Sequence, residues 1–380
     1  MEWKEVDICQ LCDSVSETYK GNASEVVLIN TSDVLDGKCL NHEYVPNKKL
    51  KGQFKKTFRK GDILYSEIRP ANKRFCFVDF EPKDYIASTK LMVLRAHEDV
   101  DPQYLYQILR SNDTLTQLQM LAESRSGTFP QITYSELSNI MVSLPSQKAQ
   151  KNIVSILSSL DRKIELNNKI NADLEEMAQA IFKNWLSECS DDVTIGELSL
   201  NITNYEKTDA EEVVLINSSD VTEGYFDHHN YSPNKNLKGH FKKRFQKGDI
   251  LYSQVRPRNR HWAYCNFDAN DYLASTQLMV IRNNPSLITS ILLYQYIISD
   301  NVWKEFTLKT ETRSGTFPQG NYEDLSQIRV PYNSDVEGIS NQLETLYAKM
   351  FMLEKESSRL SLLRDTLLPR LMSGEIEVPE

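Results

Sequence analysis

The stretch VVLINTSDVLDG at residues 26–37 opens a segment, Val26 to Arg95, that occurs again as Val213 to Arg282. The second copy opens VVLINSSDVTEG, and about 41 of the 70 aligned positions are identical at a constant offset of 187. After one inserted residue the likeness resumes with RSGTFPQ, at 125–131 and 313–319. A repeat this long is a whole domain used twice, not a solenoid unit of roughly 20 to 50 residues. The 380-residue chain is therefore expected to hold two similar domains.

Apolar patterns inside the first copy predict strands followed by a helix. Short runs at Val26–Ile29, Ile63–Ser66, Phe75–Phe80 and Leu91–Leu94 are bounded by turn residues, as strands are. From Pro102 to Leu121, leucine and isoleucine recur at spacings that fit one face of a helix. Strands first and a helix near the end favour a mixed α/β domain of the α+β kind over a doubly wound sheet.

Two further stretches, each following a copy of the domain, predict long helices. Apolar side chains from Ile153 to Trp185 are spaced alternately four and three, with Asn167 and Asn171 on the same seam. A second seam of the same period runs from Ile339 to Leu360. This period is typical of a coiled coil, in which buried asparagines fix the register at some cost in stability. Two such seams in one chain most simply bury each other.

The flanking residues set the expected helix ends. Ser146 is a predicted N-cap, and Ser334–Glu337 has the spacing of a capping box. Three leucines are predicted to extend the apolar face of the second helix until Pro369 and Gly374 end it. These leucines are Leu363, Leu367 and Leu371. The predicted order is a domain at 1–145, a central helix at 146–187, a second domain at 188–332 and a distal helix at 333–380.

The net charge of −9 averages segments of opposite sign. Residues 46–75 carry ten Lys and Arg against Asp62 and Glu67, and residues 233–262 carry nine against Asp249, so each segment has a charge of +8. Two concentrated positive segments in an otherwise acidic chain are typical of a protein that neutralises phosphates at two places. A solvated basic face would explain one such segment, but its duplication within both domains favours a function.

Several other classes of protein find no support in the sequence. No apolar run suits a bilayer, and MEWKEVDICQ at 1–10 is no signal peptide, so a cytoplasmic location is expected. Six scattered cysteines favour reduced thiols, and Cys9-Gln-Leu-Cys12 is half a zinc site without a second half, so no metal is expected. The chain has no GxxxxGK[ST], GxGxxG, Asn-Pro-Pro-Tyr or Asp-Pro-Pro-Tyr motif, so we expect neither a nucleotide cofactor nor methyltransferase chemistry in it.

Three groups of motifs point to a known family: GDILYS with a following Arg-Pro (61–70 and 248–257), SGTFPQ (126–131 and 314–319) and LLPRLMSGEI (367–376). With the alternation of domains and helices, they resemble the specificity subunits of Type I restriction–modification systems over essentially the whole chain. The resemblance implies two target recognition domains and an antiparallel coiled coil of the central and distal helices, arranged with pseudo-twofold symmetry. It implies a non-catalytic subunit whose domains each read one half of a bipartite DNA target.

The same resemblance implies partners. Methyltransferase subunits, two of them, are expected to dock on the coiled coil and to bring S-adenosylmethionine. Motor-endonuclease subunits are expected to bind through the methyltransferase subunits and to bring ATP and Mg²⁺. This chain itself is expected to hold no cofactor.

The candidate DNA contacts follow from side-chain chemistry. Lysine suits phosphate contacts, as a mobile point charge, whereas base reading needs donors and acceptors in fixed geometry. The phosphate candidates are Lys48, Lys51, Lys55, Lys56, Lys60 and Lys73, with Lys235, Lys238, Lys242, Lys243 and Lys247. The base-reading candidates are Glu67, Arg69, Asn72 and Arg74, with Gln254, Arg256, Arg258, Asn259 and Arg260; Arg125 and Arg313 precede glycine loops that can approach a phosphate. Each arginine could instead form a structural salt bridge.

High identity between the copies leads to a hypothesis about the target. Near-identical domains related by a pseudo-twofold axis should read near-identical half-sites on opposite strands, giving an interrupted, nearly palindromic sequence. Glu67 opposite Gln254 is the difference that matters most, because a carboxylate accepts from cytosine N4 whereas Gln pairs with adenine. Ala71 opposite Arg258 and Arg74 opposite His261 come next.

Two other functions stay open. One is a self-sufficient nuclease or methyltransferase with an unfamiliar active site, although no paired catalytic residues stand at motif spacing. The other is a scaffold whose coiled coil binds only protein and whose basic segments are incidental. The aromatic residues of Phe75–Phe80 and Trp262–Phe267 could stack on bases, but alternation within a strand favours a place in the core.

Overall fold

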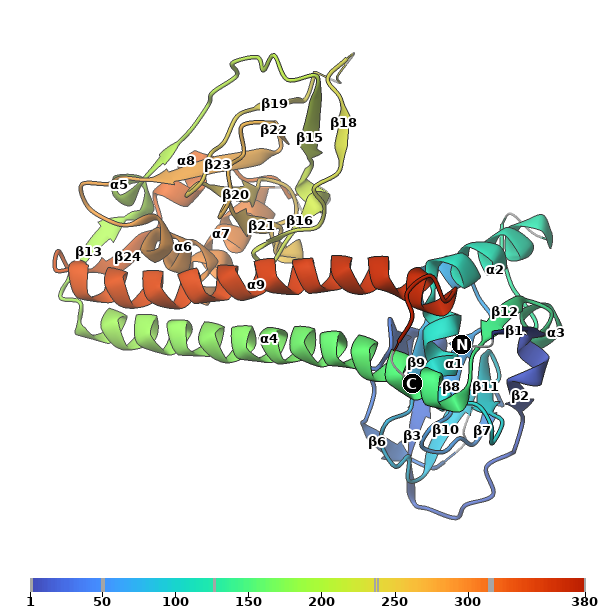
Figure 1. Cartoon of the computed structure of the whole chain (residues 1–380). Coiled ribbons are helices and arrows are strands. Elements are labelled where there is room, and N and C mark those ends of the chain that lie inside the picture. The colour runs from blue at the N-terminus through green and yellow to red at the C-terminus, as the bar shows by residue number, and fades with distance from the viewer. Residues whose placement is uncertain are drawn as a thin grey trace. The chain divides into compact units, whose positions relative to one another are not determined.

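The computed structural model describes residues 3–48, 52–125, 128–235, 237, 239–313 and 318–378 (Figure 1). The chain divides into two compact units. The first consists of Met1–Glu165 with Ser357–Glu380, and the second of Leu166–Glu356. Each unit holds one copy of the repeat together with part of both long helices.

The described residues of the first unit form two four-stranded sheets, with strand orders β6-β3-β10-β7 and β2-β11-β8-β9, and three shorter α-helices. A further pair, β1 with β12, is antiparallel. The strands are β1 Lys4–Asp7, β2 Cys12–Val15, β3 Glu25–Ile29, β4 Val34–Leu35, β5 Lys38–Cys39, β6 Tyr44–Pro46, β7 Phe54–Lys56, β8 Ile63–Ser66, β9 Phe75–Phe77, β10 Tyr85–Ser88, β11 Leu91–Ala96 and β12 Met141–Leu144. The helices are α1 Pro102–Arg110, α2 Asn112–Arg125 and α3 Tyr134–Ser138.

The second unit repeats this topology, with sheets ordered β18-β15-β22-β19 and β14-β23-β20-β21. Its strands are β13 Asp191–Thr194, β14 Ser199–Asn201, β15 Glu212–Ile216, β16 Val221–Thr222, β17 Tyr225–Phe226, β18 Tyr231–Pro233, β19 Phe241–Lys243, β20 Ile250–Ser253, β21 Trp262–Tyr264, β22 Tyr272–Ser275, β23 Leu278–Asn283 and β24 Arg329–Tyr332. Its short helices are α5 Ile195–Leu198, α6 Ser290–Ile298, α7 Asp300–Arg313 and α8 Tyr322–Ser326. The predicted duplication of a mixed α/β domain is confirmed.

Aromatic residues form part of the core of each unit. The ring of Tyr65 stacks on that of Phe75 with 5.4 Å between centroids, and Tyr252 stacks on Trp262 at 5.6 Å. Phe75 and Trp262 are only 1% and 4% exposed. These two side chains therefore stabilise the sheets and are not available to stack on bases, as the alternation of aromatic residues predicted.

The long helices are α4 Gln147–Glu188 and α9 Glu337–Met372, and they run antiparallel within each unit. In the second unit, Asn167 donates to the Glu356 carboxylate at 2.8 Å and Asn171 to the Met350 carbonyl at 3.2 Å, so the helices are paired in opposite directions. In the first unit, Leu368 and Leu371 of α9 pack in one core cluster with Ile153 and Leu157 of α4. The two seams bury each other, and the asparagines lie on the seam as predicted.

Some predicted ends and boundaries are wrong. The single helix over 102–121 is two helices, because Ser111 adopts an extended backbone and its hydroxyl accepts from the Thr114 amide at 3.2 Å. Helix α9 begins at Glu337 itself, so Ser334 does not cap it, and it continues past Pro369 to Met372. Pro369 removes one backbone hydrogen bond, and only three residues of the helix follow it. The predicted N-cap at Ser146 is confirmed by its bond from the Ala149 amide at 3.3 Å.

The apolar face of α9 also differs from its prediction near the C-terminal end. Leu363 is 46% exposed, whereas Leu368 and Leu371 are buried. The period of the seam continues from Leu360 to position 364, which is an arginine, and then to Leu367 and Leu371. Because Arg364 is not apolar, the apolar pattern alone led to Leu363 as the next seam residue, which was wrong. Among the described helices, none combines the length and the apolar content that a bilayer crossing requires.

Candidate nucleic-acid interface

The loop after β8 carries most of the predicted base-reading residues. We define the Arg-Pro loop as residues 67–74 in the first unit and 254–261 in the second. Each loop contains a 3₁₀ turn flanked by two residues with left-handed backbone: φ is 45° at Arg69 and 52° at Lys73, and 48° at Arg256 and 53° at Arg260. Such a conformation costs a non-glycine residue roughly 1–2 kcal/mol. Strain retained at equivalent positions of both copies is typical of a functional segment.

Backbone bonds to the segment after α2 or α7 hold the strained loop in place. The Arg69 amide donates to the Pro130 carbonyl at 3.1 Å, and the Arg256 amide donates to the Pro318 carbonyl at 3.0 Å. Helix α2 adds a bond from the Ala71 amide to the Gln119 side chain at 3.0 Å. Helix α7 instead uses Trp303, whose indole donates to the Pro257 carbonyl at 2.9 Å.

The predicted base reader Arg74, and the residue at its position in the second copy, contact backbone carbonyls outside the Arg-Pro loop. The Arg74 guanidinium donates to the carbonyls of Ser32, at 3.0 Å, and Val34, at 3.4 Å. In the second copy a His261 ring nitrogen lies 2.7 Å from the Val221 carbonyl, which is the equivalent of Val34. Arginine and histidine therefore make the same contact at this position. We expect the substitution to contribute little to any difference in the bases that the two domains recognise.

Other predicted arginines also have partners within their domain. The Arg258 guanidinium donates to Glu311 at 2.7 Å, and Arg125 pairs with Glu136 at 3.0 Å. Arg260 lies 4.4 Å from the centre of the Trp303 ring and 3.5 Å from an Asp300 oxygen. The side chain of Arg313 lies outside the described residues. Arg258 remains 72% exposed and so keeps access to solvent.

Lys56 and Lys243 have an internal role. The Lys56 ammonium donates to the carbonyls of Thr89, at 3.2 Å, and Leu91, at 2.8 Å, and Lys243 bonds Thr276 and Leu278 in the same way. Burial lowers the pKa of both lysines. These ammonium groups connect one edge strand to the turn that follows β10 or β22. They are therefore not retained as phosphate contacts.

The remaining described lysine candidates are exposed. Exposed side chains are Lys48, Lys55, Lys60 and Lys73 in the first unit and Lys235, Lys242 and Lys247 in the second. The other two candidates, Lys51 and Lys238, lie outside the described residues. Lys60 precedes β8 and the Arg-Pro loop follows it, and a strand of four residues spans about 13 Å. Lys60 and the Arg-Pro loop, at opposite ends of β8, could therefore contact different phosphates of one DNA strand.

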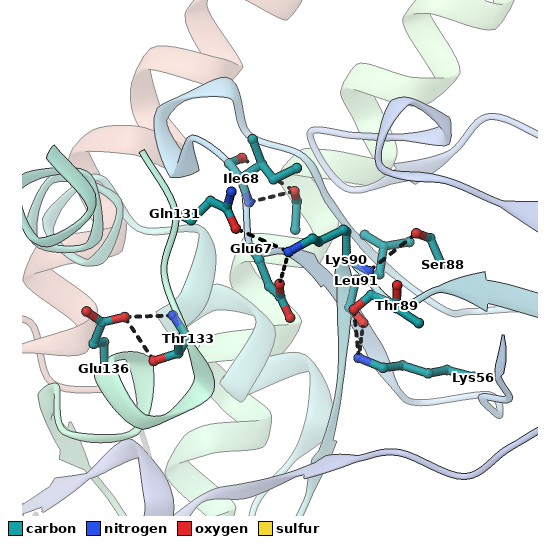
Figure 2. Close-up of polar contacts among 11 residues, drawn as sticks. Lys56, Glu67, Ile68, Ser88, Thr89, Lys90, Leu91, Gln131, Thr133 and Glu136 are labelled. Carbon is teal, nitrogen blue, oxygen red and sulfur yellow. Dashed lines mark hydrogen bonds and ion pairs between the residues drawn. The ribbon is translucent and has the colours of Figure 1, made fainter. Parts of the chain in front are cut away.

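Glu67 begins the Arg-Pro loop and is part of a small polar cluster (Figure 2). The Lys90 ammonium lies 3.4 Å from a Glu67 carboxylate oxygen and 3.2 Å from the side-chain oxygen of Gln131. The Glu67 side chain is 24% exposed and that of Lys90 49% exposed. The cluster is thus fixed by neighbours from three segments while its edge stays open to solvent.

Sequence reasoning missed a buried ion pair that each unit repeats. Arg95 forms two bonds of 2.8 Å to the Asp62 carboxylate, and Arg282 binds Asp249 at 2.6 and 2.8 Å. Asp62 and Asp249 are 1% and 0% exposed, and these bonds raise the pKa of both arginines. The aspartate of GDILYS therefore positions the turn that begins β8 or β20. The signal was present, since both partners are identical in the two copies.

The architecture defines a class of protein: two equivalent mixed α/β domains, each with a strained Arg-Pro loop, that alternate with two long antiparallel helices. Residues 2–176 match the family described as Type I restriction modification DNA specificity domain. The Type I restriction enzyme HindI specificity subunit of Haemophilus influenzae is 46% identical over 186 residues, which are 48% of this chain and 40% of that protein. The matched part thus spans less than half the length of that relative.

Two further comparisons cover more of the chain. The Type I restriction enzyme MjaIX specificity subunit of Methanocaldococcus jannaschii is 23% identical over 90% of this chain and 85% of its own. The crystal structure of a Type-I restriction-modification system S subunit from M. genitalium has a TM-score of 0.56 at 16% identity, covering 100% of this chain and 97% of that one, which concerns the fold alone. Residues 2–176 of this chain are thus similar to the DNA specificity domain of Type I restriction–modification systems, and 90% of the chain aligns at lower identity with a specificity subunit of such a system.

Proposed function

We propose that this chain selects the DNA sequence on which a Type I restriction–modification complex acts. The observation that carries the proposal is the duplicated Arg-Pro loop, which keeps the same strained backbone in both copies of the domain, the first of which lies in the residues that match the DNA specificity family. A strained loop lowers the stability of the fold. This cost is expected where a loop must present hydrogen-bond donors and acceptors in fixed positions.

Phosphate contacts are assigned to the exposed lysines. These are Lys48, Lys55, Lys60 and Lys73, with Lys235, Lys242 and Lys247. Base contacts are assigned to the exposed or half-exposed polar side chains of the Arg-Pro loops. These are Glu67, Arg69 and Asn72 in the first unit and Gln254, Arg256, Arg258 and Asn259 in the second. Because the two loops share one backbone frame, each domain reads one of two similar half-sites, and the target is interrupted and nearly palindromic.

The paired helices supply the proposed docking surface for other subunits. Their seam is buried, but the outer faces of α4 and α9 are exposed along their length. We assign these faces to two methyltransferase subunits, through which the motor-endonuclease subunits bind. In this arrangement the chain itself is non-catalytic, and S-adenosylmethionine, ATP and Mg²⁺ are held by the partners. We expect this complex to act in the cytoplasm.

The test uses the complex that purifies with the tagged full chain. Mapping of methylated sites should reveal one bipartite motif, and the logarithm of DNA affinity should fall steeply with the logarithm of salt concentration, by roughly 0.9 for each phosphate contact. Lys55→Ala or Lys242→Ala should each reduce the slope by about that amount. Lys83→Ala is the charge-matched control, because Lys83 is exposed at the far end of β10 from the Arg-Pro loop. A flat salt dependence would support the scaffold and reject the proposal.

A further inference from the structure

The first and second domains share one backbone frame around the start of the Arg-Pro loop. The Glu67 amide donates to the Lys90 carbonyl at 3.1 Å, and the Gln254 amide donates to the Gln277 carbonyl at 2.9 Å. On the other side, the Glu67 carbonyl accepts from Ile132 at 2.8 Å and the Gln254 carbonyl accepts from Gly320 at 2.8 Å. Since positions 67 and 254 are fixed between the same two neighbours, differences there lie in the side chains alone.

Two positions whose side chains pair in the first domain have changed together between the copies. The first domain has Glu67 with Lys90, an ion pair, and the second has the neutral Gln254 and Gln277. The side-chain oxygen of Gln277 accepts from the Ser218 hydroxyl at 3.3 Å. The joint change keeps the net charge of the cluster at zero. The third member does not change, because Gln131 and Gln319 are both glutamine. A surface ion pair is worth only about 0–1 kcal/mol, so folding alone gives little reason to keep the partners matched.

The chemistry of the two pairs is different. An ionised carboxylate only accepts hydrogen bonds and an ammonium only donates them, whereas a glutamine amide does both. Among the described contacts, Lys90 approaches one carboxylate oxygen of Glu67, Oε2, so Oε1 remains to accept from a base. Glu67 with Lys90 thus offers an acceptor for cytosine N4 beside a donor for guanine O6 or N7. Gln254 offers the donor and acceptor that match adenine N6 and N7.

We propose that Glu67 with Lys90, and Gln254 with Gln277, are the specificity determinants that make the two half-sites of the target unequal. The first domain selects a C·G pair at the position where the second selects an A·T pair. Lys90 and Gln277 act with the loop residues although they lie on the turn before β11 or β23, outside the loop itself. This inference rests on the proposed function and deepens it.

The experiment exchanges the pairs in the full chain, purified as its complex. E67Q/K90Q gives the first domain the side chains of the second, and Q254E/Q277K does the reverse. Each exchange should change the preferred base pair at one position of one half-site, by roughly 5- to 150-fold in relative affinity or methylation rate. The first variant should then read a more symmetric motif. E67Q alone should lose affinity for the original site without gaining the new one, because the Lys90 ammonium remains beside the amide.

E81Q/K83Q is the matched control, because both residues are exposed and lie at the opposite end of β10 from Lys90. It should leave the motif unchanged, and all variants should melt within about 5 °C of the original chain. An unchanged motif in both exchanged variants overturns the inference while leaving DNA recognition intact. Loss of methylation at every site in a folded variant also overturns it, since the pair would then only hold the loop. Failure of the unaltered complex to bind DNA is separate and rejects the proposed function.

Discussion

The two units contain the same domain but join it to the helix pair by different chemistry. In the first unit, Asp161 of α4 binds Arg110 of α1 at 3.0 Å and Arg364 of α9 at 2.8 Å. In the second unit the equivalent helix position is Tyr347, whose hydroxyl accepts from Gln295 of α6 at 2.6 Å. The Tyr347 ring lies against Tyr294 and Phe351, with centroids 5.9 and 5.7 Å away.

This difference shows how a duplicated domain keeps its fold while its attachment diverges. Two domain residues at the joint are the same, since Gln107 and Tyr106 of α1 occupy the positions of Gln295 and Tyr294 in α6, but Arg110 is replaced by Ile298. Each joint therefore differs on both sides, in its helix residue and in one domain residue. An ionic joint depends on salt and on each charge having a partner, whereas an aromatic joint depends on buried area.

Removing the aromatic side chain should cost the second unit most. Tyr347 is 4% exposed, so Tyr347→Ala deletes a buried ring and is expected to destabilise the second unit by about 3–5 kcal/mol. Tyr347→Phe keeps the ring and loses one hydrogen bond, at about 1 kcal/mol. Hydrogen exchange of the α6 amides measures both. If the two variants proved equally mild, the ring would not be the main contact of this joint.

Breaking the ionic joint should have a smaller but substantial effect on the first unit. Asp161→Ala leaves Arg110 and Arg364, whose side chains are 10% and 18% exposed, without their shared counter-charge. Partial exposure reduces the cost of a fully buried pair, so we expect about 2–3 kcal/mol, read from exchange of the α1 amides. Asp365→Ala is the control, because Asp365 pairs with Arg364 at the surface and should change stability by less than about 0.5 kcal/mol. Equal effects would show that Asp161 does not connect the helices.

The two joints should also respond differently to pH. Burial raises the pKa of Glu354 to about 7, opposed by a bond from Asn266 and assisted by the nearby Glu175 carboxylate. The folded second unit therefore holds a proton that the unfolded chain has lost, so its stability falls as pH rises from about 4.5 to about 7. The equivalent helix position in the first unit is Asn168, which has no such proton.

Glu354→Gln tests this prediction. The variant should lose the dependence in this pH range and should be more stable than the original chain above pH 7, with the α6 amides as the reporter. The α1 amides of the first unit serve as the internal reference. If hydrogen exchange in the second unit has the same pH dependence in the original chain and in the Glu354→Gln variant, another group causes the effect.

Some of these features could be predicted from the sequence and others could not. Duplication, strands, seams and the family motifs were all visible as repeated or periodic residues, because regular structure follows local patterns. The roles of Lys56, Lys243 and Arg74 could not be predicted. A lysine that binds carbonyls inside the protein and a lysine that faces a phosphate cannot be distinguished from the neighbouring sequence. Asp161 and Tyr347 were equally hidden, since their partners lie more than 50 residues away in α1 and α6. The structure separates charges that act inside the protein from those that remain available.

Arg74 and His261 provide the test with the smallest expected effect. Both side chains reach the carbonyl of an equivalent valine, so Arg74→His should leave the recognised base pairs unchanged and alter stability by no more than about 1 kcal/mol. The measurement is the methylated motif of the complex together with its melting temperature, and His261→Arg is the reciprocal variant. The result separates two kinds of difference between the domains. A change in motif from either variant would make this position a base reader, and the bond to the carbonyl would then be secondary. An unchanged motif, beside a changed one for the pair at 67 and 90, would locate the asymmetry of the target at the start of the Arg-Pro loop.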